Sequence, residues 1–254
     1  MKCFRNSIFT AAALAVLATA SLPAQEIKRL SNGKPDLNGV WDHPRVGDMT
    51  KSSTECASGS TGCKQEGMAD LPYAAWGLEQ WKNPVHFDYT ARCLPWGYSR
   101  TLGTEYPVEM VQTPQRLAIL FESNNVFHVI PTDGRDHPKN LDSAWFGNSV
   151  GKYDGDTLVI DSIGFNDSTY LDTAEHPHSD QLHLVERYTP IDANHLSYEV
   201  TIDDKKAYEK PWKNTRTFVR MKPGSELMEF VCMENNKDLF EGHIPLQAKP
   251  YGGR

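Results

Sequence analysis

Beyond residue 107 the chain consists of short strand-like segments separated by turns, with no helical segment between them. Nine such segments follow one another: EMVQT, RLAILFE, VFHVIPT, SVGKY, DTLVIDSIGF, LHLVERYTP, LSYEVTID, TRTFVRM and LMEFVCME. The separators are rich in Asn, Asp, Gly and Pro, as in Asp154-Gly155 and Lys222-Pro223-Gly224, which is typical of hairpins and turns. Short separators make consecutive strands antiparallel neighbours, and they exclude architectures built from strand-helix-strand units.

These strands are expected to close into a barrel, because closure of a long meander removes the exposed strand edges. We therefore predict a mainly β protein with an antiparallel up-and-down barrel over residues 108–254, and a β-sandwich is the alternative. Residues 25–107 are predicted to form long N-terminal loops and one or two short helices that pack on the barrel, within a single domain overall.

The best helix candidate upstream of the barrel is DLPYAAWGLEQWKNP, residues 70–84. Its apolar residues recur near helical spacing, Asp70 is placed to cap the first turn, and Pro84 is placed to end the helix. The later segment CLPWGYSRTLGTEYP is rich in Pro, Gly and aromatic residues, and we predict a loop there.

The first 24 residues have the features of a secretory signal peptide. Lys2 and Arg5 form a basic start, an apolar centre runs from Ile8 to Leu17, and small residues follow, with cleavage after Ala20 or Ala24. Loss of Lys2 and Arg5 takes the net charge from −7 to about −9, which disfavours nucleic acid as a partner. No other apolar run is long enough for a membrane span, so we expect a secreted or periplasmic protein.

Four cysteines remain after the signal peptide: Cys56, Cys63, Cys93 and Cys232. An even number in an oxidising compartment predicts two disulfides. We favour Cys56 with Cys63, because ECASGSTGC can fold back on itself, and Cys93 with Cys232. Zinc ligation is the weaker alternative, since the chain has no C-x-x-C and no Cys/His pair at zinc spacing.

Two strand-like segments carry charged residues in line with apolar ones. In FHVIPTDGR, the period-2 alternation of a strand is predicted to place on one apolar face Phe127, Val129, Pro131, Asp133 and Arg135. In the second segment, the inward face is predicted to carry Leu182, Leu184, Glu186 and Tyr188, with Arg187 outward. Burying an unpaired charge is costly, so such groups are expected to be paired, protonated or used in function.

The run Asp133-Gly134-Arg135-Asp136-His137 combines acid, base and anion-binding side chains at the end of a strand. Asp133 or His137 is the predicted catalytic base, and Arg100 and Arg135 are predicted to hold developing negative charge. The alternative is a surface turn in which Asp133 caps backbone amides and Arg135 forms an ion pair. Glu186 in turn is either the catalytic acid or a structural partner of Arg135 or Arg100.

A second polar cluster is His176-Pro177-His178-Ser179-Asp180. The H-x-H spacing can present two imidazoles to a metal ion, with Asp172 or Glu175 completing the site. We favour His178 as an acid or base close to Glu186 and expect no cofactor, with a metal ion as the alternative. The chain has no phosphate loop, no dinucleotide fingerprint and no G-x-S-x-G nucleophile motif.

Aromatic residues are plentiful, and several stand in loops where they can line the mouth of a barrel. A flat or apolar ring-bearing ligand suits such a lining. The predicted substrate-binding residues are Trp96, Trp145, Tyr188, Arg100 and Arg135.

Several motifs together are similar to those of a known family. They are PDLNGVWD, CLPWGYSR, PTDGRDHP, WFGNSVGKYDGDTLVIDSIGFND, HSDQLHLVERY, YEVTIDD and KPW. The combination resembles a family of secreted, mostly uncharacterised bacterial proteins whose strand pattern is similar to that of lipocalins and other calycins. Gly39-Val40-Trp41 likewise resembles the first lipocalin strand, with its Trp plugging one end of the core. The resemblance covers residues 35–235 and implies a calycin-like barrel without a particular activity; it departs at FVCMENN, where the family has Cys-His-Glu-Gly-Asn.

The sequence therefore predicts a class of chemistry. The first hypothesis is a secreted lyase or hydrolase that uses general acid-base catalysis, without a redox cofactor, on a small aromatic or phenolic substrate such as an aryl ether. The alternatives are a lipocalin-like carrier of a small hydrophobic ligand and a structural envelope protein. A carrier of apolar ligands needs few buried ionisable groups, whereas acid-base catalysis needs them inside the barrel.

Overall fold

The computed structural model describes residues 26–52, 66–67, 71–84 and 89–243. The predicted signal peptide and the predicted Cys56–Cys63 disulfide lie outside the described residues. Within the described ranges, no helix is long and apolar enough to cross a membrane.

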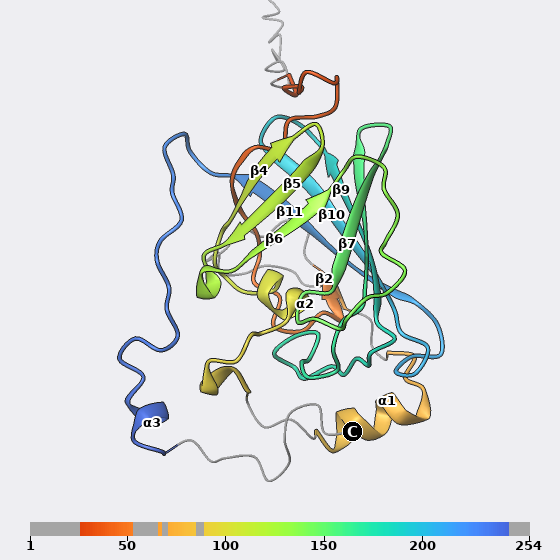
Figure 1. Ribbon diagram of the computed structural model, residues 1–254, viewed down its shortest axis with the longest axis vertical. Helices are drawn as coiled ribbons and strands as arrows, with labels where there is room; N and C mark the ends of the chain where they lie inside the picture. The colour runs from red at the N-terminus through yellow and green to blue at the C-terminus, as the bar shows by residue number, and fades with distance from the viewer. Residues whose placement is uncertain (1–25, 53–65, 68–70, 85–88, 244–254) are drawn as a thin grey trace, which may run out of the picture.

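Nine strands form one antiparallel sheet that curls into a nearly closed up-and-down barrel (Figure 1), which confirms the predicted fold class. Their order around the barrel is β6-β5-β4-β1-β11-β10-β9-β8-β7. The barrel strands are β1 (Gly39–Asp42), β4 (Val108–Thr113), β5 (Arg116–Phe121), β6 (Phe127–Pro131), β7 (Asn148–Asp154), β8 (Thr157–Ile163), β9 (His183–Pro190), β10 (His195–Asp203) and β11 (Trp212–Arg220). A separate two-stranded ladder joins β2 (Lys51–Ser52) to β3 (Glu66–Gly67).

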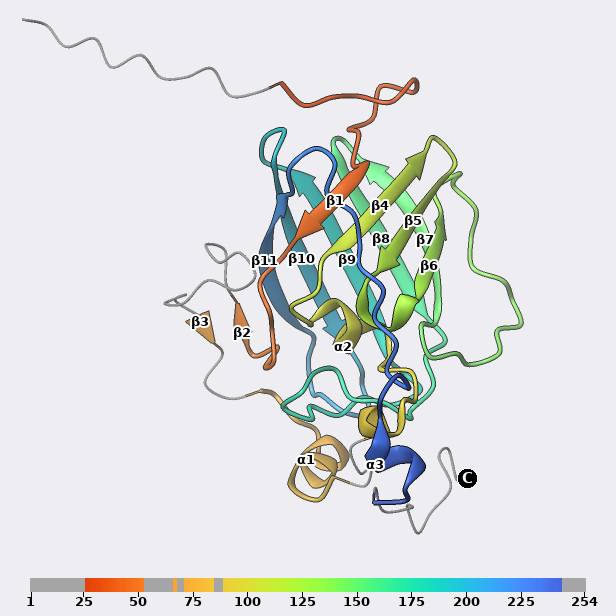
Figure 2. The same cartoon turned by 90° about the vertical axis from the view of Figure 1, so that its left-hand side faces the viewer.

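Eight of the nine predicted segments form strands, but LMEFVCME does not. The ninth strand is β1, which pairs with β4 on one side and with β11 on the other. Because β1 and β10 already occupy both edges of β11, no edge of β11 is left for the chain that follows it. That segment instead runs along the outside of the barrel (Figure 2), where the Met228 amide donates to Glu122 Oε2 at 2.9 Å.

The predicted helix is present as α1 (Ala75–Lys82). It begins after Ala74 without a side-chain cap, and Asp70, the predicted cap, lies outside the described residues. The prediction of a loop after Cys93 was incomplete, because the segment forms the short helix α2 (Tyr98–Leu102), which follows a 3₁₀ turn, η1 (Tyr89–Arg92).

A second 3₁₀ turn, η2 (Ser123–Asn125), joins β5 to β6, and α3 (Lys237–Phe240) lies near the C-terminus. Helices α1, α2 and α3 all lie at the lower end of the barrel in both views, and α2 is the one directly against it (Figures 1 and 2). This end of the barrel is therefore covered by loops and helices.

The predicted hairpin between β7 and β8 is present, with its turn one residue later than expected. Asp154 pairs with Thr157, so the two turn residues are Gly155 and Asp156. Gly155 takes the first turn position because its φ of +60° is a left-handed conformation that favours glycine.

Trp41 closes the barrel end remote from α2, as its G-x-W context predicts. Its side chain is fully buried, and its indole Nε1 donates to the Leu37 carbonyl at 2.9 Å. The guanidinium of Arg220 lies 4.1 Å from the ring centroid and donates to the Ala193 carbonyl. A buried aromatic ring under a cation thus plugs the core at this end.

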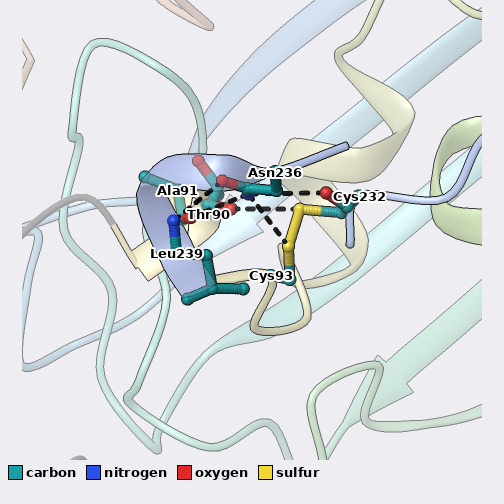
Figure 3. The surroundings of a disulfide bond; sticks show 6 residues. All are labelled: Thr90, Ala91, Cys93, Cys232, Asn236 and Leu239. Atoms are coloured by element: carbon teal, nitrogen blue, oxygen red, sulfur yellow. Dashed lines mark hydrogen bonds between the residues drawn. A yellow bond between two sulfur atoms is a disulfide. The ribbon is translucent and has the colours of Figure 1, made fainter. Parts of the chain in front are cut away.

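The predicted Cys93–Cys232 disulfide is present and ties the segment after η1 to the chain beyond the barrel. The two Cα atoms are 5.5 Å apart, across 139 positions of sequence. Figure 3 shows Asn236 beside the bridge, where its amide donates to the Cys232 carbonyl at 3.4 Å and its carbonyl accepts from the Leu239 amide of α3 at 3.1 Å. The disulfide therefore anchors the C-terminal segment to the covered end.

The predicted alternation is present in both β9 and β6, but in β6 the buried face is the opposite of the one that was expected to be apolar. In β9, Glu186 is buried and Arg187 points outward to Asp154 at 2.9 Å. In β6 it is His128 that is buried, while Phe127 is 67% exposed. Alternation sets the spacing along a strand but not which face is inward, and β6 has apolar residues on both faces.

Candidate functional site

The centre of the candidate site is Glu186, a fully buried carboxyl group inside the barrel. Its Oε1 accepts hydrogen bonds from the hydroxyls of Tyr98 at 2.9 Å, Tyr198 at 3.0 Å and Tyr188 at 3.3 Å. Its Oε2 is buried and has no hydrogen-bond partner among the described residues. One oxygen of the carboxyl group is thus saturated by phenols and the other is left unpaired.

Three elements bring these phenols together. Glu186 and Tyr188 lie two residues apart on β9 and therefore share its inward face. Tyr198 stands directly opposite Tyr188 in the β9–β10 ladder, so it shares that face. Tyr98 comes from α2 and reaches into the barrel from the covered end. Helix α2 thus contributes directly to the interior.

Burial raises the pKa of Glu186 to about 7, although the hydrogen bonds from the three tyrosines and the charge of Arg216 oppose this shift. The pKa values of the three phenols lie well above 10, chiefly because the hydroxyls are buried and secondly because of the Glu186 charge. Near neutral pH the carboxyl group therefore exchanges a proton while the tyrosines remain hydrogen-bond donors.

Arg216 is the positive charge of the interior, and it is buried on the inward face of β11. Its Nε donates to Asn214 Oδ1 at 2.9 Å, and its Nη1 donates to the Leu102 carbonyl of α2 at 2.6 Å. Its guanidinium lies 5.3 Å from the ring of Tyr198. Arg216 thus joins α2 to the barrel wall and supplies a cation close to Glu186, a role predicted for Arg135 or Arg100.

His128 spans the seam between β6 and β7, the two ends of the sheet order. Its Nε2 lies 2.7 Å from Ser149 Oγ, which is 2.5 Å from Ser162 Oγ on β8. Burial lowers the pKa of His128 to about 4, so the imidazole is neutral at physiological pH. A neutral side-chain network therefore links strands whose backbones do not pair.

Asp133 and Arg135, predicted on the inward face, are exposed and pair with each other. Arg135 Nη2 lies 2.6 Å from Asp133 Oδ2, and its Nε donates to Oδ1 at 2.9 Å. This hydrogen bonding lowers the pKa of the Asp133 carboxyl group. The inward orientation was wrong because these residues lie on the same side of the strand as Val129, whose side chain is exposed. The alternative of a surface turn describes the geometry.

Replacing Asp133 with Ala is expected to leave catalytic turnover within about twofold of the wild type, because an exposed pair contributes little to the barrel interior. The measurement is the initial rate with whichever substrate the wild-type protein converts. A large loss of rate in this variant would place the reaction on the outer loop after β6 rather than inside the barrel.

His137 and His178 also lie apart from the carboxyl group of Glu186, whose hydrogen bonds go to tyrosines only. His137 Nε2 lies 3.0 Å from Asp161 Oδ1, in a half-exposed cluster with His183. His178 is buried in the loop that joins β8 to β9, and its Nε2 lies 2.7 Å from Thr169 Oγ1. Among these four predicted catalytic residues, Glu186 thus shares no hydrogen bond with Asp133, His137 or His178.

Two of the predicted substrate-binding residues share a pocket on the outer side of α2. Trp96 and Arg100 line this pocket of about 180 Å³ together with Tyr106. The Trp145 carbonyl accepts from the first amide of α2, that of Tyr98, at 3.3 Å. Arg100 therefore belongs to α2, Trp96 and Trp145 lie beside that helix, Tyr188 lies inside the barrel, and Arg135 is exposed in the loop after β6.

A possible metal-binding group consists of Asp48, Asp172 and His176, whose ligand atoms lie within 4.8 Å of one another. His176 Nδ1 is 2.7 Å from Asp172 Oδ2, and that oxygen also accepts from the Met49 amide at 2.6 Å. The predicted metal ligands His176 and Asp172 thus come together with Asp48 in place of His178. Because Asp172 accepts from the Met49 amide, this group also holds the loop before β2 in place.

Sequence reasoning missed Tyr98, Tyr198, Arg216 and His128. Arg216 had the same signal as Glu186, because it alternates with Phe218 on one face of TRTFVRM. Tyr98 gave no such signal, since the segment that carries it has no strand or helix period of useful length.

No protein-family model, no curated protein and no solved structure matches this chain. What the protein does is therefore inferred from the chemistry of its own residues. Glu186 can give up a proton near neutral pH, and its Oε2 has no partner among the described residues that would hold that proton. Three phenol hydroxyls and Arg216 would stabilise the carboxylate that remains.

Proposed function

We propose that this protein is a secreted enzyme that cleaves a carbon-oxygen bond in a small aromatic or phenolic compound by general acid-base catalysis. The observation that carries this proposal is the buried, unpartnered Oε2 of Glu186, on a carboxyl group with a pKa of about 7. A general acid works best when its pKa is near the working pH. The reaction class is a lyase or a hydrolase that needs no redox cofactor.

In the proposed step, Glu186 Oε2 donates its proton to the leaving oxygen of the substrate. The carbon-oxygen bond breaks, and its electron pair goes to that oxygen. In a hydrolase a water molecule then bonds to the carbon, and in a lyase the neighbouring carbon loses a proton and a double bond forms; in either case the proton released passes to the Glu186 carboxylate and restores the acid. The negative charge moves to the Glu186 carboxylate, where Oε1 already accepts from Tyr98, Tyr188 and Tyr198. These donors are in place before the reaction, so they stabilise the charge without reorganisation.

An aromatic substrate is supported by the rings that surround the carboxyl group. Tyr188 and Tyr198 lie 5.0 Å apart between ring centroids, and Phe218 lies 5.3 Å from Tyr198. These rings contact one another, so a substrate that reaches Glu186 meets a lining of aromatic surface. Because Glu186 has no exposed surface, we infer that the substrate enters when α2 moves, from the pocket lined by Trp96 and Arg100. The Cys93–Cys232 disulfide is compatible with the secretion predicted from the N-terminus.

The proposal is tested by incubating the purified protein with a pool of phenolic ethers, glycosides and esters and following products by mass spectrometry. A new product that the Glu186→Gln variant does not form supports the enzyme. A compound that both proteins retain unchanged points to a carrier. If no product forms and no compound is retained, the result points to a structural protein. A parallel incubation with a chelator decides whether a metal ion at Asp48, Asp172 and His176 takes part.

Stability should also report the protonation of Glu186. Its pKa rises from 4.5 in the unfolded chain to about 7 in the fold, so the folded state holds the proton more tightly. This stabilisation is complete below pH 4.5 and is lost as the pH rises through 7. Relative to Glu186→Gln, the wild type is expected to lose about 2 to 3 kcal/mol of unfolding free energy between pH 5 and pH 8.

Denaturant unfolding of both proteins at the two pH values measures this change. The difference between the proteins is used because His43 and His128, with pKa values lowered to about 4, change stability in the opposite direction. Their contribution is common to both proteins and cancels. A difference that does not vary with pH would mean that Glu186 is not the buried proton carrier described here.

A further inference from the structure

A second buried polar atom in the barrel lacks a partner, and it belongs to His43. This residue follows β1 and is fully buried. Its Nδ1 lies 3.4 Å from the Pro44 carbonyl, whereas its Nε2 has no hydrogen-bond partner among the described residues. The imidazole is stacked on Phe218, with ring centroids 5.0 Å apart and an interplanar angle of 27°. The ring is therefore held in place while one of its nitrogens is unused.

His43 is neutral at every pH at which Glu186 gains or loses its proton. Burial and, secondly, the charge of Arg216 lower the pKa of the imidazole to about 4, against the smaller effect of the Pro44 and Tyr106 carbonyls. A carbonyl only accepts, so the 3.4 Å contact of Nδ1 with the Pro44 carbonyl favours the tautomer with the ring proton on Nδ1. Nε2 then carries a lone pair and can only accept a hydrogen bond.

His43 and Glu186 belong to the same interior. Phe218, on which His43 stacks, lies 5.9 Å from the ring of Tyr188 and 5.3 Å from that of Tyr198, and both tyrosines hold Glu186. Arg216, two residues before Phe218 on the same face of β11, acts electrostatically on both the imidazole and the carboxyl group. One unpartnered acceptor and one unpartnered carboxyl oxygen thus flank a shared set of rings.

We propose that His43 Nε2 accepts a hydrogen bond from a hydroxyl group of the substrate, while Glu186 Oε2 faces an acceptor oxygen of the same molecule. This inference rests on the proposed function and narrows its substrate class to hydroxylated aromatic compounds that also carry an ether or carbonyl oxygen. A buried acceptor without a partner is unfavourable, and a substrate donor removes that cost.

His43 acts here as a positioning residue and not as the base. An imidazole that binds a proton only near pH 4 is too weak to remove one from carbon at neutral pH, but it accepts hydrogen bonds over the whole working range. The interior should therefore discriminate between two aromatic compounds that differ only in a hydroxyl group. A site built to hydrogen-bond a hydroxyl rejects the analogue that lacks it.

The test measures binding of three probes by calorimetry at pH 6, where Glu186 is mostly protonated. Acetophenone offers a ring and an acceptor oxygen, and 3- and 4-hydroxyacetophenone add a hydroxyl group. The wild type is expected to bind the better hydroxylated isomer about tenfold more tightly than acetophenone. In the His43→Phe variant, which keeps a ring on Phe218 but has no acceptor, the ratio should fall to about one.

Two further variants complete the design. His43→Gln keeps an acceptor and should restore part of the preference. His195→Phe makes the same substitution at a histidine that pairs with Asp192 outside the interior, at 2.9 Å, and should leave the preference unchanged. Because His43→Phe removes an unpartnered buried nitrogen, the variant should melt at or above the wild-type temperature.

A wild-type ratio near one, or a ratio retained in His43→Phe, overturns this inference. The proposed function survives that result if Glu186→Gln still weakens the binding of acetophenone itself. If no probe binds the wild type, both the aromatic-binding interior and the role of His43 are overturned.

Discussion

Replacing Glu186 with Gln is expected to lower kcat for the cleavage reaction by about 10²- to 10⁴-fold, the range typical of a lost general acid. The amide has the shape of the carboxyl group and keeps an oxygen that accepts from Tyr98, Tyr188 and Tyr198. It has no acidic proton for the leaving oxygen. The measurement is the steady-state rate with the substrate identified from the phenolic pool.

The pH profile separates a chemical role of Glu186 from a structural one. Wild-type kcat should fall above pH 7, as the carboxyl group with a pKa of about 7 loses its proton, and the residual rate of Glu186→Gln should lack that fall. Glu199→Gln is the matched control, since Glu199 lies on the neighbouring strand β10 and pairs outward with Lys213 at 2.7 Å. A full rate in Glu186→Gln excludes Glu186 as the acid.

Removal of the Cys93–Cys232 disulfide is the change expected to cost most stability. The bridge closes a loop across 139 positions, and in the chain-entropy model a loop of that length stabilises the fold by about 5 kcal/mol. A protein with Ser at both positions should therefore unfold at a markedly lower denaturant concentration. Equilibrium unfolding, followed by tryptophan fluorescence, measures the loss.

The control for the disulfide is Met233→Ser, a substitution at a half-exposed neighbour of Cys232 that leaves the bridge intact. Its unfolding midpoint should stay close to that of the wild type. If the double Ser variant also unfolds at the wild-type midpoint, the bridge does not restrict the unfolded chain as the chain-entropy model assumes. The C-terminal segment would then be a loosely coupled appendage of the barrel.

Much of the fold was predictable because hairpins are local. Asp154-Gly155 and the other short separators predicted the hairpins β4–β5, β7–β8 and β9–β10, since a short turn leaves two adjacent strands little choice of partner. The place of β1 was not predictable in this way. It pairs with β4 and β11, both far along the chain, and no local pattern shows which distant edges meet.

The candidate site was predictable in part for a related reason. Glu186 alternates with Leu182 and Leu184, and most apolar residues of this segment lie on that face. The inward direction of the Glu186 side chain therefore followed from the sequence. Phe127 and His128 stand in a strand with apolar residues on both faces, and the wrong face was chosen. Alternation fixes which residues share a face, and only packing against the rest of the barrel decides which face is buried.

Residue order alone predicted an antiparallel β-barrel, a Cys93–Cys232 disulfide and an inward carboxyl group at position 186, and the structure has all three. The barrel and the inward carboxyl group depend on residue order over short distances. The disulfide was expected because the number of cysteines after the signal peptide is even. The meeting of Tyr98 and Arg216 with Glu186 was not predictable, because it depends on how distant elements pack to bury apolar surface. That packing is a property of the whole chain, and it raises the pKa of Glu186 to about 7 by removing its carboxyl group from water.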